Sequence, residues 1–201
     1  MLSYEGIKVV MKDLEPRYFT LKDYIKVLYD ATYMMTKYKK YLKLIDTKFN
    51  SNIMLAVTYV NGCKICSYYH AKELLKSGAS DEELKSMLDG SFKNLEKEDT
   101  KALLFAEHYA DVKGDYDKES FRKLIDEYGK DKAYGIMATI KLIMFGNISG
   151  ISLGNMKERF KLKHPQNSKL LTDLSILLST VILMPLFIII NLFRKRKEFS
   201  Y

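Results

Sequence analysis

Several residue types are scarce in this 201-residue chain, and their scarcity excludes whole classes of protein. The chain contains no Trp, two Cys, three Pro and ten Gly. So few Gly and Pro argue against collagen, disordered low-complexity sequence and a turn-rich β-sandwich. Two Cys are too few for the several disulfides that hold a small secreted domain together. No G-x-x-x-x-G-K-[S/T] run for a P-loop and no G-x-G-x-x-G run for a dinucleotide site occurs either.

Most of the chain also lacks an excess of charge of one sign. Residues 1–156 carry 24 basic and 22 acidic side chains, whereas residues 157–201 carry nine basic and three acidic ones. A nucleic-acid-binding domain spreads its basic residues over the folded body, together with a matching motif. Here the basic residues flank an apolar segment instead. The pattern therefore predicts no nucleic-acid partner and favours an anionic membrane surface.

The apolar segment covers residues 174–193, which include no charged residue. Asp173 precedes it, and the basic run Arg194–Lys197 follows it. Twenty residues of helix at about 1.5 Å each are long enough for the ~30 Å hydrocarbon core of a bilayer. Pro185 and several polar residues raise the cost of insertion. We therefore expect a membrane-associated helix, with burial between the subunits of an oligomer as the alternative.

The chain divides into a domain at residues 1–165 and a basic linker with a hydrophobic helix at residues 166–201. Residues 1–17 contain no apolar run of signal-peptide length and carry acidic side chains, so the sequence predicts no export signal. We accordingly expect the domain to lie on the cytoplasmic face of the membrane, where thiols are kept reduced.

The remaining pattern predicts an all-α fold. Apolar residues recur at three-to-four spacing, and no alternation typical of a strand extends beyond a few residues. Ser80 and Glu83 have the spacing of a capping box, which opens a short helix ended by Gly90. Residues 51–60 are apolar and fit either a helix or a strand. The other expected helices cover residues 20–46, 63–77, 98–112, 117–128 and 133–145.

One motif carries chemistry, and it is the run Cys63-Lys64-Ile65-Cys66-Ser67-Tyr68-Tyr69-His70. On a helix, side chains three and four positions apart share a face, so Cys63, Cys66 and His70 are expected together. Asn61-Gly62 places both cysteines in the first turn, where free amides and the helix dipole favour a thiolate. A two-residue spacer lets a thiol pair close and reopen a disulfide, and His70 can move the proton.

Two other interpretations of this motif remain open. The cysteines can be small buried apolar residues, as free Cys often is. With His70 they can also be three ligands of a zinc ion, although no fourth ligand is close in the sequence. A separate Gly-rich run at residues 146–150 either lines a ligand pocket or lets two helices pack closely.

The residues that carry a family resemblance run from Asn61 to His70 and continue with Ala71, Leu74, Gly78, Ser80 and Glu83. This pattern resembles the alkylhydroperoxidase D (AhpD)-like branch of the carboxymuconolactone decarboxylase family. The likeness is specific over residues 50–90, and the order of helices is compatible through residue 145. It implies an all-helical homo-oligomer that uses a cysteine pair as its redox centre, without a metal or an organic cofactor.

The resemblance also implies a role for each residue of the motif. Cys66 would attack the peroxide, Cys63 would resolve the sulfenic acid into a disulfide, and His70 would relay the proton. The peroxidases of the family carry a Glu twelve residues before the first Cys, where this chain has Ser51. A Ser hydroxyl is no carboxylate base at pH 7. Ser51 is thus the candidate relay position, and disulfide exchange is expected to depend on it less than peroxide reduction does.

We therefore expect a cysteine-dependent oxidoreductase that reduces hydroperoxides or exchanges disulfides, with an unidentified thiol as electron donor. The family's lactone decarboxylases lack the cysteine pair, so their activity is not implied. The alternative is a non-catalytic, membrane-associated oligomeric scaffold whose cysteines are structural or regulatory.

Overall fold

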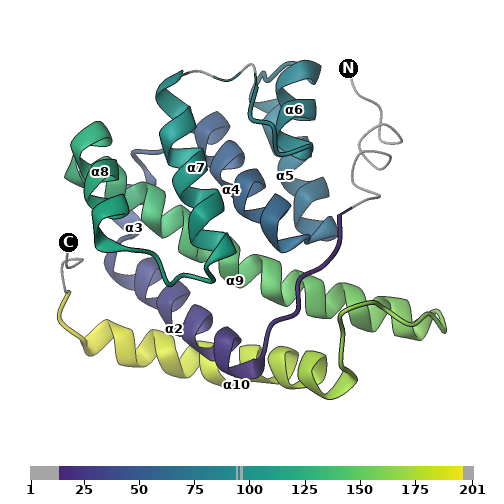
Figure 1. Cartoon of the computed structure of the whole chain (residues 1–201). Coiled ribbons are helices and arrows are strands. Elements are labelled where there is room, and N and C mark those ends of the chain that lie inside the picture. Colours follow the sequence, from purple (N-terminus) through teal and green to yellow (C-terminus); the bar gives the residue numbers. More distant parts are fainter. Residues whose placement is uncertain (1–13, 94, 96, 197–201) are drawn as a thin grey trace.

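The computed structural model describes residues 14–93, 95 and 97–196, and these residues form helices and loops without a strand (Figure 1). The all-α fold class is confirmed. The helices are α2 (Leu21–Lys37), α3 (Lys39–Leu42), α4 (Thr47–Asn61), α5 (Lys64–Lys76), α6 (Asp81–Leu88), α7 (Lys97–Asp111), α8 (Lys118–Tyr128), α9 (Lys130–Phe160) and α10 (Leu170–Phe193). Residues 1–13, on which most of the expectation about an export signal depends, lie outside the described residues.

The helix starts follow from local capping. In α6, the Glu83 amide donates to the Ser80 hydroxyl at 3.1 Å, and the Ser80 amide donates to the Glu83 carboxylate at 2.8 Å. This confirms the predicted capping box. Thr20 and Asp23 make the same reciprocal pair at the start of α2. The side chain of Asp117 accepts from the Ser120 amide at 2.7 Å and starts α8.

Three expected elements differ from the observed ones. The helix expected over residues 20–46 is interrupted at Tyr38, which ends α2 and precedes the single turn of α3. The ambiguous segment 51–60 is helical and belongs to α4. The helix expected over residues 133–145 continues to Phe160, because the glycines after residue 145 remain helical inside α9.

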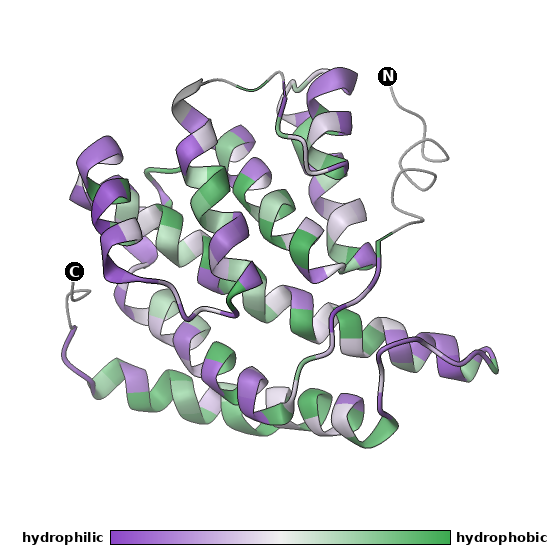
Figure 2. Ribbon diagram, viewed as in Figure 1, coloured by the Kyte–Doolittle hydropathy of each residue, from purple (hydrophilic) through white to green (hydrophobic). Residues whose placement is uncertain are grey.

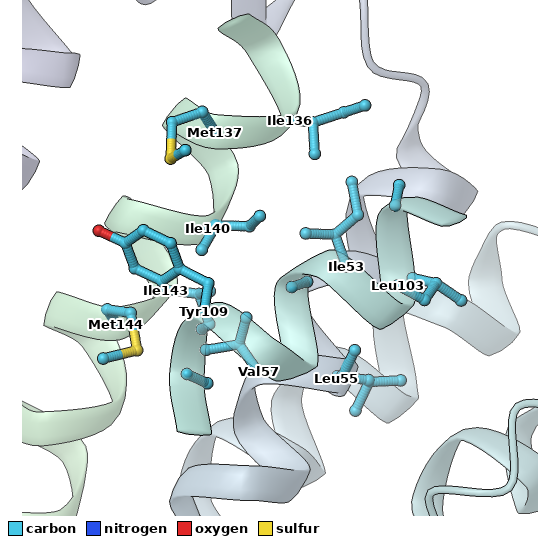
Figure 3. Packing of buried hydrophobic residues seen from close by; sticks show 14 of the residues in the cluster. Ile53, Leu55, Val57, Leu103, Tyr109, Ile136, Met137, Ile140, Ile143 and Met144 are labelled. Carbon is cyan, nitrogen blue, oxygen red and sulfur yellow. The ribbon is translucent and has the colours of Figure 1, made fainter. Parts of the chain in front are cut away.

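The core lies where α4, α7 and α9 meet (Figure 3). Ile53 of α4, Leu103 of α7 and Ile140 of α9 are all fully buried. A buried aliphatic side chain of this size stabilises the fold by about 1.5–3 kcal/mol. The middle of α9 is therefore a core helix. It is apolar enough to cross a membrane, and 61% of its most apolar window is buried inside the protein, which explains that composition.

The last helix, α10, lies along the outside of the bundle against α2 and α9 (Figure 1). It is the second helix of the described residues that is long and apolar enough to cross a membrane, and only 11% of its most apolar window is buried. The hydrophobic helix expected at the end of the chain is therefore present, as an added layer on one side of the bundle.

Candidate dithiol–disulfide site

The turn between α4 and α5 positions the cysteines. Gly62 ends α4 with a left-handed φ of +70°. A Cβ at this position would lie 2.0 Å from the Glu15 carbonyl oxygen, so only glycine fits. The Arg17 amide also donates to the Asn61 carbonyl at 3.0 Å, which holds the chain before α2 over this turn. The backbone thereby delivers Cys63 to the start of α5.

Cys63 and Cys66 are joined as a disulfide, with their Cα atoms 5.4 Å apart. Cys63 is the N-cap of α5, and its sulfur accepts the Cys66 backbone N–H at 3.3 Å. An amide donor and the positive end of the helix dipole both stabilise a thiolate at this sulfur. Cys63 is only 1% exposed, whereas Cys66 is partly exposed. The two sulfurs are therefore unequal in both charge stabilisation and access.

Helix α9 covers the other side of the disulfide at its glycines. A Cβ built on Gly150 would lie 2.8 Å from both sulfur atoms, which is closer than any real side-chain atom could remain. The Cys66 sulfur lies 3.6 Å from the Gly146 carbonyl oxygen, which can accept a hydrogen bond from a thiol at this position. The Gly-rich run therefore lets α9 approach the two cysteines closely, as the close-packing interpretation predicts, and Gly150 also lines a cleft.

His70 lies one turn after Cys66 on α5 and is partly buried. Burial lowers its pKa from 6.5 to about 4, and the nearby Glu73 carboxylate opposes that shift. The imidazole is therefore neutral at pH 7 and is a weaker base than an exposed histidine. The edge of its ring packs against Tyr69 with centroids 5.1 Å apart, and no hydrogen bond joins it to another described residue.

Ser51 lies in α4, which packs against α5, and its side chain is 2% exposed. Neither a hydrogen bond nor an ion pair connects it to His70 among the contacts of the described residues. The next side chain, Asn52, is also buried, and both of its polar atoms lack a hydrogen-bond partner there. The carboxylate that acts on His70 is Glu73, which in turn accepts from Lys76 at 2.7 Å.

A cleft of about 740 Å³ opens beside the disulfide, and Gly62, Ile65 and Gly150 line it on that side. Its opposite wall comes from the end of α9 and the linker to α10. This wall carries three lysines and one histidine, which are Lys157, Lys161, Lys163 and His164. Two lining residues of the cleft are acidic, Glu15 and Glu158. The sequence showed this linker to be basic, but not that it lies near the cysteines.

The sequence model of the carboxymuconolactone decarboxylase family matches residues 29–91. This segment is similar to that family. It contains Ser51, both cysteines and His70, so the family resemblance expected from the motif is confirmed. Helices α7 to α10 follow the carboxymuconolactone decarboxylase segment and lie outside the match. No curated protein and no solved structure matches the chain.

The zinc interpretation needs at least three ligands that converge. Within residues 14–93, 95 and 97–196, no group of three or more His, Cys, Asp or Glu side chains is placed to hold a metal ion. The cysteines of the carboxymuconolactone decarboxylase segment are bonded to one another instead. The geometry thus fits two-electron thiol chemistry.

Proposed function

We propose that the protein is a dithiol–disulfide oxidoreductase that reduces hydroperoxides or exchanges disulfides through Cys63 and Cys66. The observation that supports this most directly is the inequality of the two sulfurs. Cys66 is the partly exposed residue of the pair, and Cys63 is the buried one, whose sulfur accepts an amide N–H. A disulfide with one accessible sulfur and one stabilised leaving group suits repeated opening and closing.

In the oxidative half-reaction, the Cys66 thiolate attacks the outer oxygen of a hydroperoxide and breaks the O–O bond. The alcohol leaves with a proton, and Cys66 becomes a sulfenic acid. The Cys63 thiolate then attacks the Cys66 sulfur and expels water, which forms the disulfide. His70 lies one turn after Cys66 and is neutral at pH 7, so its ring can relay the proton from the Cys66 thiol without keeping it.

In the reductive half-reaction, the thiolate of a donor attacks the exposed Cys66 sulfur. A mixed disulfide forms, and Cys63 leaves as a thiolate that the Cys66 amide stabilises. A second donor thiol then attacks the mixed disulfide and releases the oxidised donor, so that both cysteines are again reduced. In total, two donor thiols are oxidised for each hydroperoxide, which gives one alcohol and one water.

The cleft beside the disulfide supports an anionic donor or substrate. Its outer wall carries Lys157, Lys161 and Lys163, which are all exposed. Cationic side chains raise the local concentration of an anionic thiol and lower the pKa of that thiol. We therefore expect a negatively charged donor to reduce the disulfide faster than a positively charged one of similar thiol reactivity.

Single-turnover chemistry on the full-length protein tests the proposal. The reduced wild type, Cys63→Ser and Cys66→Ser receive one equivalent of cumene hydroperoxide, and free thiols and dimedone adducts are then counted by mass spectrometry. We expect a disulfide in the wild type, a trapped sulfenic acid on Cys66 in Cys63→Ser, and no reaction in Cys66→Ser. The oxidised wild type is then reduced with glutathione or with cysteamine, and glutathione should be faster.

Thiols that stay free in the wild type, with a disulfide that neither donor opens in the folded state, would refute the proposal. That outcome would favour the scaffold alternative, in which the cysteines only stabilise the turn. Turnover separates the two roles, because a purely structural disulfide stabilises the fold but is not repeatedly reduced by the donor and reoxidised by the hydroperoxide.

A further inference from the structure

Helix α10 presents an apolar face to the outside of the molecule. We call this face the outer face of α10 and define it by Leu171, Leu178, Val181, Ile182, Ile189 and Leu192. Each of these side chains is more than half exposed. The exposed Leu174 and Leu186 fill the two seven-residue gaps between them, so apolar side chains form one continuous stripe along the helix. Figure 2 shows the green of apolar residues over most of the length of α10.

The opposite face of α10 contributes polar groups to the protein body. The Asn191 amide nitrogen donates to the Thr32 hydroxyl at 3.0 Å, and Asn191 is fully buried. The Thr180 hydroxyl is hydrogen-bonded to the Tyr24 hydroxyl. This arrangement is the reverse of a surface helix in water, whose polar side chains face the solvent. A solvent-exposed apolar stripe of this length indicates a surface that contacts an apolar partner.

Both ends of α10 are attached to the same side of the body. Near its start, the Thr172 hydroxyl lies 3.3 Å from the Tyr18 hydroxyl. At its end, Lys37 donates to the Leu192 carbonyl at 3.0 Å. The helix therefore lies lengthwise on α2 and does not project from the bundle. If α10 crossed a bilayer, α2 would enter with it, and the exposed Lys22 and Lys26 would be costly in the hydrocarbon.

The charges at the two ends of α10 indicate whether its outer face contacts a lipid surface or a second copy of this chain. Lys163 and Lys169 are exposed before the helix, and Arg194, Lys195 and Arg196 are exposed after it. Between residues 159 and 196 the sequence contains one carboxylate, Asp173, and Arg159 donates to it at 2.6 Å. Two outer faces packed in either direction would bring these cations close together. Anionic headgroups would instead attract both ends.

We propose that the outer face of α10 sits in one leaflet of an anionic membrane, with the helix parallel to the membrane plane. The apolar stripe enters the boundary between headgroups and acyl chains, and the basic residues at both ends contact the headgroups. Arg194 also lies over the rings of Tyr29 and Tyr33, at 5.7 and 6.0 Å from their centroids. Tyrosine is enriched at this depth of membranes. The binding does not depend on the thiol chemistry proposed above.

Vesicle flotation of the full-length protein tests the binding. The vesicles contain either phosphatidylcholine alone or phosphatidylcholine with one quarter phosphatidylglycerol. We expect flotation with the anionic vesicles, weakened by salt, and at least about tenfold weaker partition for the double variant Val181→Glu/Ile182→Glu. Leu104→Glu is the matched control, because Leu104 is an exposed apolar residue of α7 and should leave the partition unchanged. Circular dichroism and thiol counts verify that the variants fold.

Tryptophan fluorescence tests the orientation, since the chain has no native Trp. Single variants place Trp at Leu171, Ile182 and Phe193, which are all well exposed. Lipids brominated near the headgroup should quench all three equally, as expected for a helix in the membrane plane. Weaker quenching at Ile182 than at both ends with these lipids would show a spanning helix and overturn the proposal. A stable oligomer that binds no vesicle and dissociates in Val181→Glu/Ile182→Glu would also overturn it, in favour of a second copy.

Discussion

The contact between α9 and the disulfide makes a single methyl group informative. Gly150→Ala adds a Cβ that would lie 2.8 Å from the sulfurs of Cys63 and Cys66. Gly154→Ala is a matched control on the same helix, because its Cβ meets only the end of Ile65 at 3.6 Å, an ordinary contact. Both glycines line the same cleft. The two substitutions therefore differ mainly in what the new methyl group touches.

The two substitutions should change the free energy of unfolding of the oxidised protein in opposite directions. Gly to Ala inside a helix stabilises by about 0.5–1 kcal/mol, and Gly154→Ala should gain about this much. Overpacking costs about 1–3 kcal/mol, so oxidised Gly150→Ala should be less stable than the oxidised wild type. Once the disulfide is reduced, Cys66 can rotate away from the new methyl group. The penalty therefore falls mainly on the oxidised form, and the disulfide becomes easier to reduce by about 30 mV for each 1.4 kcal/mol.

Two measurements check this prediction. Urea unfolding of the oxidised and reduced forms gives the stability difference, and equilibration in glutathione redox buffers gives the reduction potential. Thermodynamic linkage requires the two results to agree. If Gly150→Ala stabilises both forms as much as Gly154→Ala does, the close approach of α9 to the sulfurs is not a constraint, and the reasoning is refuted.

Two further predictions concern Ser51 and His70. Ser51→Glu should raise the rate of hydroperoxide reduction by about 10²-fold, since a positioned base contributes at least this much. The control Ser51→Gln should not raise this rate. Equal rates for both variants in stopped-flow assays would show that Ser51 is not a relay position. The lowered pKa of His70, about 4 against 6.5, means that the unfolded chain binds more protons between these pH values. Stability should therefore fall as the pH falls from about 6.5 to 4, and His70→Asn should lose less than the wild type in urea unfolding at pH 7 and pH 4.5.

The features that the sequence predicted well depend on residues close together in the chain. The capping box of Ser80 and Glu83 and the N-terminal position of the cysteines follow from neighbours within a few residues. The length of α9 does not, because Gly146 and Gly150 are typical of a helix end when they are considered alone. Both remain helical inside α9, and at Gly150 the disulfide lies where a side chain would be, which a local pattern cannot show.

The properties of α10 that matter most depend on distant residues. Its apolar composition was evident, but the direction in which each side chain points was not. Thr32 and Tyr24, the partners of Asn191 and Thr180, are more than 150 positions away. The basic wall of the cleft has the same origin, because only the folded chain brings Lys157 near the cysteine turn. Long-range placement of this kind leaves no local pattern in a single sequence.

The short stretch before α2 links the redox pair to the last helix. Arg17 donates to Asn61 at the cysteine turn, whereas the Pro16 carbonyl accepts from Asn167 of the linker at 3.3 Å. The cysteine turn and the linker before α10 are thus connected through the adjacent residues Pro16 and Arg17. If α10 lies on a membrane surface, the cleft is held at a fixed distance from that surface and in a fixed orientation. A soluble donor would then meet every copy in the same orientation relative to that surface.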